Sequence, residues 1–342
     1  MKAGYVLSPG ILTVEETDLP NIGPHEVLVR VRACGVCASD VKFFRGLKTY
    51  RETPYGRESP GFTGHEWAGE VVAAGEEVAD FSVGDHVAPF LIISCGLCKF
   101  CRVGRNNLCP EKKYVHGGFA EYIKVPSHNL LRLPHEVDFE DACFVEPLAC
   151  CLNGLEKLGL HVDDVVLVIG DGPMGLLNLM VLKTFGVKVI LAGHHRHRLS
   201  MAEKLGAEYA ANPLETDLET IVRKATDGYG ADAVIIAVNN KQAAETALSL
   251  VSKGGIVNVF AGAHPTYEIN IDINKIHYSE LAITGSADAQ KKHYQQAIEI
   301  IANKSITPSK LITHRYPLTE IQTAFETAES KQSVKTVVKP WG

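Results

Sequence analysis

The chain has 342 residues, of which 46% are hydrophobic and 22% are charged. This length predicts two domains, and the apolar content supports sizeable cores, so a disordered or collagen-like chain is excluded. The 34 basic and 40 acidic residues give a net charge of −6, which argues against nucleic-acid or membrane-surface binding. The sequence contains no signal-peptide core and no run of 18 apolar residues, so we expect a cytoplasmic protein.

The first part of the chain predicts an irregular, strand-rich domain. From Tyr5 to about Pro147, short β-like runs such as Val27–Val31 and Val71–Ala74 are interrupted by Gly, Pro and Asp. The nine cysteines suit metal binding or free thiols better than disulfides in an intracellular protein. The cysteines expected to be buried free thiols, rather than redox switches, are Cys34, Cys143, Cys150 and Cys151.

Four further cysteines form a pattern that is typical of a structural metal site. Cys95, Cys98, Cys101 and Cys109 follow C-x2-C-x2-C-x7-C on a loop that contains glycine. Four thiolates can complete a tetrahedral zinc shell that has no open position, and such a site stabilises the fold. An iron–sulfur cluster and a chance grouping are the alternatives, but the spacing of the fourth cysteine and the lack of a second cluster motif favour zinc.

Three separate segments offer ligands for a second, open metal site, and they contain Cys37, His65 with Glu66, and Glu146. One thiolate, one imidazole and carboxylates suit zinc, and a carboxylate that can dissociate leaves room for water or a substrate. Each segment alone is weak evidence, because a single cysteine is more often a core residue and a His-Glu pair is usually at the surface.

From Val165 onward, apolar runs alternate with helical patterns, which predicts a parallel sheet covered by helices on both faces. The predicted strands are Val165–Ile169, Val187–Ala192, Ala233–Ala237, Ile256–Phe260 and Leu281–Thr284. After Gly285, a predicted helix (Gln290–Ala302) leads to two short β-like runs, Leu311–Tyr316 and Thr336–Val338, which are similar to the first region.

A glycine-rich turn follows the first of these predicted strands. Gly170, Gly172 and Gly175 form G-x-G-x-x-G, and the turn opens the predicted helix Leu176–Phe185. In this context the glycines allow a tight turn and a close approach of the backbone to a pyrophosphate at the helix N-terminus. The residues expected to contact a dinucleotide are therefore Gly170, Gly172, Pro173, Met174 and Gly175.

The order of these motifs resembles the zinc-containing medium-chain dehydrogenases, specifically the polyol (sorbitol or iditol) dehydrogenase branch. The matching segments are G-V-C-A-S-D at 35–40, G-H-E at 64–66, the four-cysteine lobe, E-P-L at 146–148 and the glycine turn. The resemblance implies an α/β protein with a GroES-like catalytic domain (1–151 and 288–342) and a doubly wound Rossmann coenzyme domain (152–287). It also implies an active site in the cleft between them.

By the same resemblance, Cys37, His65 and Glu66 bind a catalytic zinc, and water or Glu146 takes the fourth position. The E-P-L segment favours the polyol branch over the primary-alcohol branch. Asp40 is expected to orient His65, as a partner of a ligating imidazole commonly does, although Asp is also a favoured helix cap.

A bound zinc lowers the pKa of an alcohol hydroxyl, so that hydride can leave, and Ser39 is expected to take the hydroxyl proton. Lys42 stands where polyol relatives often have His, so the outer part of the proton relay is left unassigned. Phe43 and Phe44 either line the mouth of the substrate pocket or belong to the core.

The coenzyme is expected to be NADP(H) rather than NAD(H). NAD-dependent folds of this kind carry an acid about 20 residues beyond the glycine turn, where it binds the ribose 2′-OH. Gly193 stands at that position, so no acid is expected there, and arginine suits a 2′-phosphate. The residues expected at this phosphate are Gly193, His194, His195, Arg196 and Arg198, in a run that also contains His197. The alternatives are a solvated helix start, with Arg198 capping or pairing locally, and a metal site on the histidines.

These observations predict a zinc-dependent oxidoreductase that transfers hydride between a nicotinamide coenzyme and the secondary alcohol of a polyol, cyclitol or sugar derivative. The expected partners are a small-molecule alcohol or ketone, two zinc ions per chain and further copies of the chain in a tetramer or dimer. The alternatives are an amino-alcohol dehydrogenase of the threonine type and a non-catalytic, zinc-stabilised nucleotide-binding protein.

Overall fold

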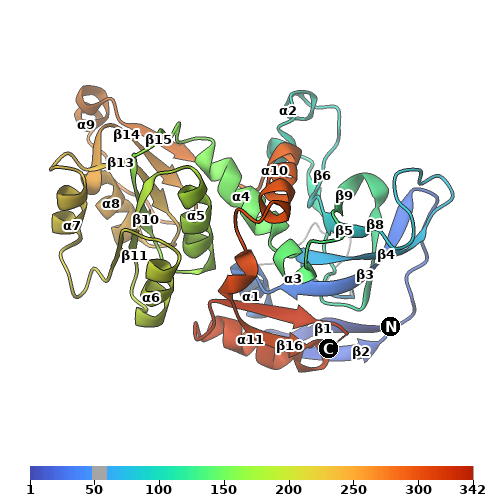
Figure 1. Ribbon diagram of the computed structural model, residues 1–342. Coiled ribbons are helices and arrows are strands. Elements are labelled where there is room, and N and C mark those ends of the chain that lie inside the picture. Colours follow the sequence, from blue (N-terminus) through green and yellow to red (C-terminus); the bar gives the residue numbers. More distant parts are fainter. Residues whose placement is uncertain (48–59, 342) are drawn as a thin grey trace. The chain divides into compact units, whose positions relative to one another are not determined.

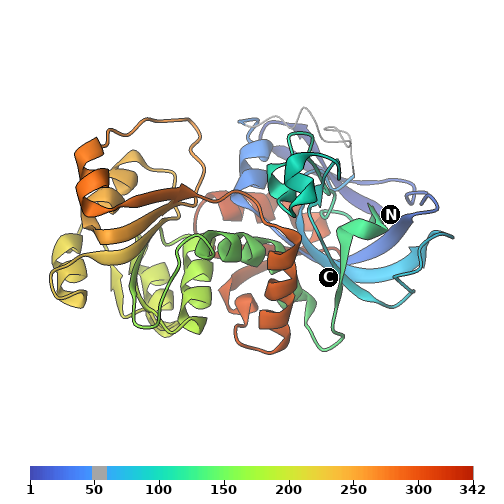
Figure 2. The ribbon, with the colours of Figure 1, turned by 90° about the horizontal axis from the view of Figure 1, so that it is seen from above.

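The computed structural model describes residues 1–47 and 60–341, which divide into two compact units (Figure 1). The first unit consists of Met1–Ala149 and Ala289–Gly342, and the second consists of Cys150–Asp288. Both ends of the chain lie in the first unit, as Figures 1 and 2 mark.

The body of the first unit is a mixed sheet in which the strands follow the order β16-β17-β3-β4-β5-β9, with β8 also paired to β3. The strands of this unit are β1 (Lys2–Ser8), β2 (Ile11–Glu16), β3 (Glu26–Gly35), β4 (Glu66–Ala74), β5 (His86–Pro89), β6 (Ile92–Ile93), β7 (Lys113–Tyr114), β8 (Tyr122–Pro126), β9 (Leu130–Leu133), β16 (Ile312–Pro317) and β17 (Lys335–Lys339). β3 and β4 are antiparallel, and their register pairs Gly35 with Glu66. The end of β3 therefore meets the start of β4.

Short helices connect and cover these strands. They are α1 (Ala38–Phe44), α2 (Lys99–Arg102), α3 (Phe139–Ala142), α4 (Val145–Leu155), which continues into the second unit, α10 (Lys291–Ala302) and α11 (Ile321–Glu329). α11 packs on the sheet through an aromatic cluster in which Phe325 lies 5.2 to 5.6 Å, between ring centroids, from Phe44, Phe62 and Phe119. Burial of these rings packs α1 against α11, through Phe44 and Phe325.

The second unit contains a parallel sheet with the strand order β12-β11-β10-β13-β14-β15. Its strands are β10 (Val165–Ile169), β11 (Lys188–Ala192), β12 (Tyr209–Ala211), β13 (Ala231–Ile236), β14 (Val251–Val259) and β15 (Ala282–Gly285). Its further helices are α5 (Pro173–Thr184), α6 (Arg196–Lys204), α7 (Leu218–Ala225), α8 (Lys241–Leu250) and α9 (Ile273–Ser279). α5 and α6 lie on one face and α7 and α8 on the other (Figure 1), which confirms the predicted doubly wound sheet.

In the second unit, two predicted element boundaries differ from the observed ones by three or more residues. The helix after the glycine turn begins at Pro173 rather than Leu176, because a proline with its fixed φ is well suited to a first helical position. β14 begins at Val251 rather than Ile256, because Val251 already pairs with Ala231 ahead of an irregularity in the register, where Gly254 has a φ of +72°. In both cases the interior of the element was predicted and its start was not.

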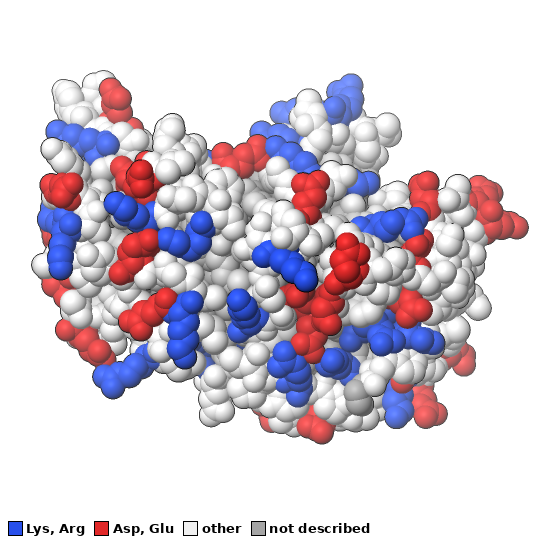
Figure 3. All heavy atoms as spheres, viewed as in Figure 1, with Lys and Arg blue, Asp and Glu red and all other residues white. Residues whose placement is uncertain are grey.

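The surface carries charges of both signs. On the face shown in Figure 3, lysine and arginine side chains are interspersed with aspartate and glutamate. Among the described residues, no helix combines the length and the apolar character that a membrane crossing requires.

Candidate active site and coenzyme turn

The structure brings Cys37, His65 and Glu66 together in the first unit. Cys37 caps α1 just beyond the end of β3, and Glu66 is the first residue of β4, so the pairing of these strands joins two distant segments. One ligand atom from each of the three residues lies within 4.8 Å of the others. His65 and Glu66 are buried and Cys37 is half-buried, which suits a protected site with access from one side.

Asp40 fixes both Cys37 and His65. One carboxylate oxygen accepts a hydrogen bond of 2.8 Å from the backbone N–H of Cys37, and the other lies 3.3 Å from His65 Nδ1. The Thr63 carbonyl oxygen lies 2.9 Å from the same ring nitrogen. Because two acceptors face Nδ1, that nitrogen carries the hydrogen and Nε2 is left as the ligand atom. Asp40 thus faces His65, as predicted, and it also stabilises the start of α1 from the third helical position, while Cys37 is the N-cap.

Burial alone would lower the pKa of His65, but the nearby Asp40 carboxylate and Cys37 raise it well above its usual value. The imidazole thus lies in a strongly negative environment that favours a cation. A thiolate, a neutral imidazole and a carboxylate form a donor set that zinc accepts, so these residues fit the metal that the motifs imply.

Lys335, in β17, lies against this cluster and was not found by sequence reasoning. Its ammonium group forms a hydrogen-bonded ion pair with Glu66, and the side chains are 4% and 1% exposed. Burial would lower the pKa of Lys335, but the Glu66 carboxylate raises it above its usual value. A Cβ atom at Gly35 would lie 2.4 Å from Glu66 Oε2 and 2.8 Å from Lys335 Cε, so the glycine makes room for the pair.

Glu146 is buried in the first turn of α4 and is not one of the three residues whose ligand atoms are grouped. Its place as a fourth ligand remains a prediction. Ser39 and Lys42 are half-buried in α1. Phe43 and Phe44 are buried, and Phe44 belongs to the aromatic cluster with Phe325, which agrees with the core alternative.

The four cysteines of the lobe around α2 also come together, with their sulfur atoms within 4.8 Å of one another. The Sγ atoms of Cys98 and Cys101 are 3.5 Å apart, and those of Cys95 and Cys101 are 3.9 Å apart. Zinc–sulfur bonds of about 2.3 Å in a tetrahedron require sulfur atoms about 3.8 Å apart, so the lobe fits zinc. Backbone N–H groups of Leu97 and Cys98 lower the pKa of Cys95 to about 7, which favours the thiolate that binds metal.

The other cysteines form no disulfide in the part of the chain that the structure describes. Cys34, Cys143 and Cys151 are buried, while Cys150 is half-buried. Burial raises the pKa of Cys34 and of Cys143, so both stay protonated and unreactive at neutral pH.

The glycine turn of the second unit has the form that a dinucleotide requires. Gly170 has a φ of +125°, and a Cβ atom at Gly175 would lie 1.8 Å from the Gly170 carbonyl oxygen, so both positions need glycine for the turn itself. A Cβ atom at Gly172 would meet nothing within 4 Å. Glycine is one of several residues favoured at a helix N-cap, and the open space beside Gly172 also lets a pyrophosphate approach the backbone closely. Pro173 is the first residue of α5, and Met174 follows it.

The segment after β11 differs in one respect from the sequence prediction, because an acid does lie beside Gly193. It is Asp171 of the glycine turn, and it accepts backbone hydrogen bonds from His194 and His195. Arg198 is buried, with a guanidinium nitrogen 3.8 Å from the Asp171 carboxylate, which matches the local-pairing alternative. The exposed members of the basic run are His194, Arg196 and His197.

Two family models match the chain, one for the alcohol dehydrogenase GroES-like domain at residues 23–135 and one for the zinc-binding dehydrogenase at residues 173–303. The sorbitol dehydrogenase of Halalkalibacterium halodurans is 34% identical over 97% of this chain and 96% of its own. This chain belongs to the zinc-containing medium-chain alcohol and polyol dehydrogenase family.

Two further relatives of the dehydrogenase are informative. The L-threonine 3-dehydrogenase of Caldanaerobacter subterraneus subsp. tengcongensis is 33% identical over 96% of this chain and 95% of its own. The solved structure of a zinc-binding dehydrogenase from Sinorhizobium meliloti 1021 bound to NADP matches with a TM-score of 0.92 at 30% identity, over 99% of each chain. The predicted fold class, a GroES-like domain with a Rossmann domain, is confirmed, and so is the prediction of a zinc-dependent oxidoreductase of the polyol dehydrogenase type.

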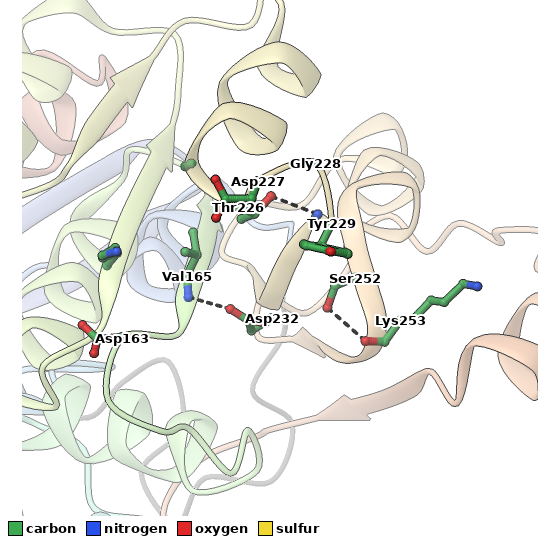
Figure 4. Close-up of a pocket in the computed structure, with 12 residues that line it drawn as sticks. Asp163, Val165, Thr226, Asp227, Gly228, Tyr229, Asp232, Ser252 and Lys253 are labelled. Atoms are coloured by element: carbon green, nitrogen blue, oxygen red, sulfur yellow. Dashed lines mark hydrogen bonds between the residues drawn. The ribbon is translucent and has the colours of Figure 1, made fainter.

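A hollow of about 610 Å³ lies elsewhere on the dehydrogenase's second unit. Figure 4 shows Val165 and Asp232 at the amino-terminal ends of β10 and β13, joined by a hydrogen bond of 2.8 Å, with Tyr229 and Lys253 at the rim. The glycine turn follows the opposite, carboxyl end of β10, where ligands of open parallel sheets bind. This hollow is therefore separate from the coenzyme turn.

Proposed function

We propose that this dehydrogenase oxidises the secondary alcohol of a polyol, cyclitol or sugar derivative with NADP⁺ and catalyses the reverse reduction with NADPH. The convergence of Cys37, His65 and Glu66 on one point carries this proposal, because it provides an open metal site in a chain that also has a dinucleotide turn. The sorbitol dehydrogenase relative supports a polyol substrate.

Cys37, His65 and Glu66 would hold the catalytic zinc, with Glu146 or water as the fourth ligand. When bound there, zinc supplies a Lewis acid that lowers the pKa of a substrate hydroxyl. Asp40 keeps the His65 ring in the orientation that presents Nε2. Ser39, two residues beyond Cys37 and half-buried, would accept the hydroxyl proton and pass it outward through water or Lys42.

Cys95, Cys98, Cys101 and Cys109 would hold a second, structural zinc. The sulfur spacings of the lobe support four-coordinate binding without an open position. Metal analysis tests this assignment: we expect two zinc ions per chain and no iron, whereas iron with a visible absorption band would support the iron–sulfur alternative.

The coenzyme would bind with its pyrophosphate at Gly172 and the start of α5, and with an adenosine 2′-phosphate near Gly193 and Arg196. The exposed Arg196 and the neighbouring histidines support this placement, as does the NADP in the Sinorhizobium relative. We also propose a homo-oligomer. β15 is an edge strand with Ile283 39% exposed, and another copy of the chain could cover it.

The test is a coenzyme-reduction assay with polyols, inositols, sugar phosphates and threonine, each with NADP⁺ and with NAD⁺. We expect a polyol-type substrate and a higher kcat/KM with NADP⁺, and a tenfold preference for NAD⁺ would refute the coenzyme assignment. Preference for threonine would support the amino-alcohol alternative, which the similarity to the L-threonine 3-dehydrogenase relative also favours. His65→Ala should abolish turnover and remove one zinc while coenzyme still binds, since the metal cluster and the glycine turn belong to different units.

A further inference from the structure

Asp171 and Gly193 lie next to each other although 21 residues separate them. β10 and β11 are parallel neighbours whose register pairs Ile169 with Ala192. Gly170 and Asp171 therefore leave the sheet beside Gly193, and the Gly170 N–H donates a hydrogen bond of 2.8 Å to the Ala192 carbonyl. The second residue of the glycine turn thus faces the segment expected to contact the far end of the coenzyme.

The Asp171 carboxylate is bound to this segment on both of its oxygens. Oδ2 accepts hydrogen bonds from the backbone N–H groups of His194, at 2.8 Å, and His195, at 2.7 Å. The His195 ring donates from Nδ1, which lies 3.0 Å from each oxygen, and Arg198 Nη1 lies 3.8 Å from Oδ1. Asp171 is only 6% exposed, so its charge is offset by these donors rather than by water.

The same carboxylate occupies the volume that a side chain at residue 193 would need. A Cβ atom built on Gly193 would lie 2.3 Å from Asp171 Cβ, 2.4 Å from Cγ and 2.5 Å from Oδ2. Asp171 Cβ is attached to the backbone and cannot swing away, and its contact alone is too close for a side chain at residue 193. An acid at residue 193, which would bind the ribose 2′-OH of NAD(H), is thus excluded while Asp171 is present.

We propose that Asp171 is a positioning residue that sets the coenzyme preference, because it excludes an acid at residue 193 and fixes His194 and His195 for an adenosine 2′-phosphate. This inference rests on the proposed use of NADP(H). Since the His195 Nδ1–H group donates to Asp171, Nε2 points away from the carboxylate and donates to a phosphate oxygen in the protonated form of the ring. Since both carboxylate oxygens are committed to protein donors, Asp171 does not itself bind the ribose hydroxyl.

The first test measures binding of 2′,5′-ADP and of 5′-AMP to zinc-loaded enzyme by calorimetry. We expect wild-type protein to bind 2′,5′-ADP more tightly. Asp171→Ala should weaken the binding of 2′,5′-ADP by about tenfold or more, as expected for loss of charge-assisted hydrogen bonds. It should weaken the binding of 5′-AMP by less than about threefold. Asp171→Asn, which keeps an oxygen for the two N–H groups, should restore much of the loss.

Asp217→Ala is the matched control. Asp217 also accepts two backbone N–H groups at a helix start in the second unit, but it lies at α7 and should leave the ratio of the two affinities unchanged. Equal weakening of both nucleotides in Asp171→Ala, or weakening of 5′-AMP alone, would overturn the positioning role. Tighter binding of 5′-AMP by the wild-type protein would instead overturn the proposed NADP(H) preference, and this role with it.

The second test uses thermal unfolding, which does not depend on coenzyme. Gly193→Ala should lower the melting temperature in the wild-type background and have little effect in Asp171→Gly, where the blocking carboxylate is gone. Gly193→Asp should bind NADH well only when combined with Asp171→Gly. The idea that Asp171 excludes a side chain at residue 193 is wrong in either of two cases. In the first, Gly193→Ala has the melting temperature of the wild type; in the second, it lowers the melting temperature by the same amount in the wild-type and Asp171→Gly backgrounds.

Discussion

Replacing Lys335 with methionine should destabilise the first unit more than any comparable change at its surface. The substitution keeps the length of the side chain and removes the ammonium group that pairs with Glu66. Both side chains are buried, so the Glu66 carboxylate cannot recover the lost interaction from water. Removing one partner of a buried pair typically costs about 3–5 kcal/mol, because the remaining charge stays buried without its partner.

The change in melting temperature follows from the size of the unit. A domain of 150–250 residues loses roughly 2–4 °C per kcal/mol, so Lys335→Met should melt about 6–20 °C below the wild type. Lys339→Met is the matched control, since Lys339 lies in the same strand and pairs with Glu140 at 3.0 Å but is 43% exposed. Pairs of that kind contribute about 0–1 kcal/mol, so this control should melt within about 4 °C of the wild type.

The assay is calorimetric unfolding of protein without zinc at Cys37, His65 and Glu66, with zinc content measured beforehand, because a metal bound to Glu66 would itself offset the carboxylate charge. Glu66→Gln combined with Lys335→Met should recover part of the stability lost in Lys335→Met, because the neutral amide can be buried at lower cost. Equal melting temperatures for Lys335→Met and Lys339→Met would refute the reasoning, because burial would then make no difference to the value of the ion pair.

The other predictions concern separate parts of the molecule. Cys98→Ser should remove one zinc and lower the melting temperature while turnover per folded molecule stays intact; lost turnover with normal melting would contradict a structural role. Gly172→Ala should lower the melting temperature only slightly, because its Cβ meets nothing and the remaining cost is that of alanine at a helix N-cap, and it should weaken NADPH binding in a fluorescence titration; unchanged affinity would argue against pyrophosphate at this position. Ser39→Ala should retain both zinc ions and lower kcat by about 10²- to 10⁴-fold, and a wild-type rate would remove Ser39 from the relay. Arg315 and Lys339 lower the pKa of Glu140, so Glu140 stabilises the folded state above its unfolded pKa and this contribution is lost as the pH falls through the folded pKa. Glu140→Gln should therefore melt below the wild type at pH 7, and the gap should close only below about pH 4; a gap independent of pH would exclude this carboxylate as its source.

Sequence reasoning worked where the signal is local. Val165–Ile169 was predicted with the bounds that the structure has, because a continuous apolar run between polar residues indicates a fully buried parallel strand. The four cysteines and the glycine turn were also found, since each is a short pattern whose spacing reflects its own geometry.

Sequence reasoning failed where a side-chain interaction joins residues that come together only in the folded protein. Lys335 and Glu66 are 269 positions apart, and a lysine at the start of a short β-like run carries no sign that it is buried. Gly193 was interpreted by itself as a position without an acid, whereas the neighbouring turn supplies one through Asp171. The register of β10 with β11 brings the two together, and sequence patterns do not give that register.

The position of β17 in the sheet has a consequence for the order in which the protein is made. β17 pairs with the end of β3 at Cys34 and Gly35, and its first residue neutralises Glu66, yet it is synthesised after the whole of the second unit. The second unit is continuous in the chain and can fold as soon as it has emerged, while the first must wait for β17 to pair with Cys34 and Gly35 at the end of β3. The pairing of β17 with β3 and of Lys335 with Glu66 is therefore completed last in biosynthesis, after the whole of the second unit has emerged from the ribosome.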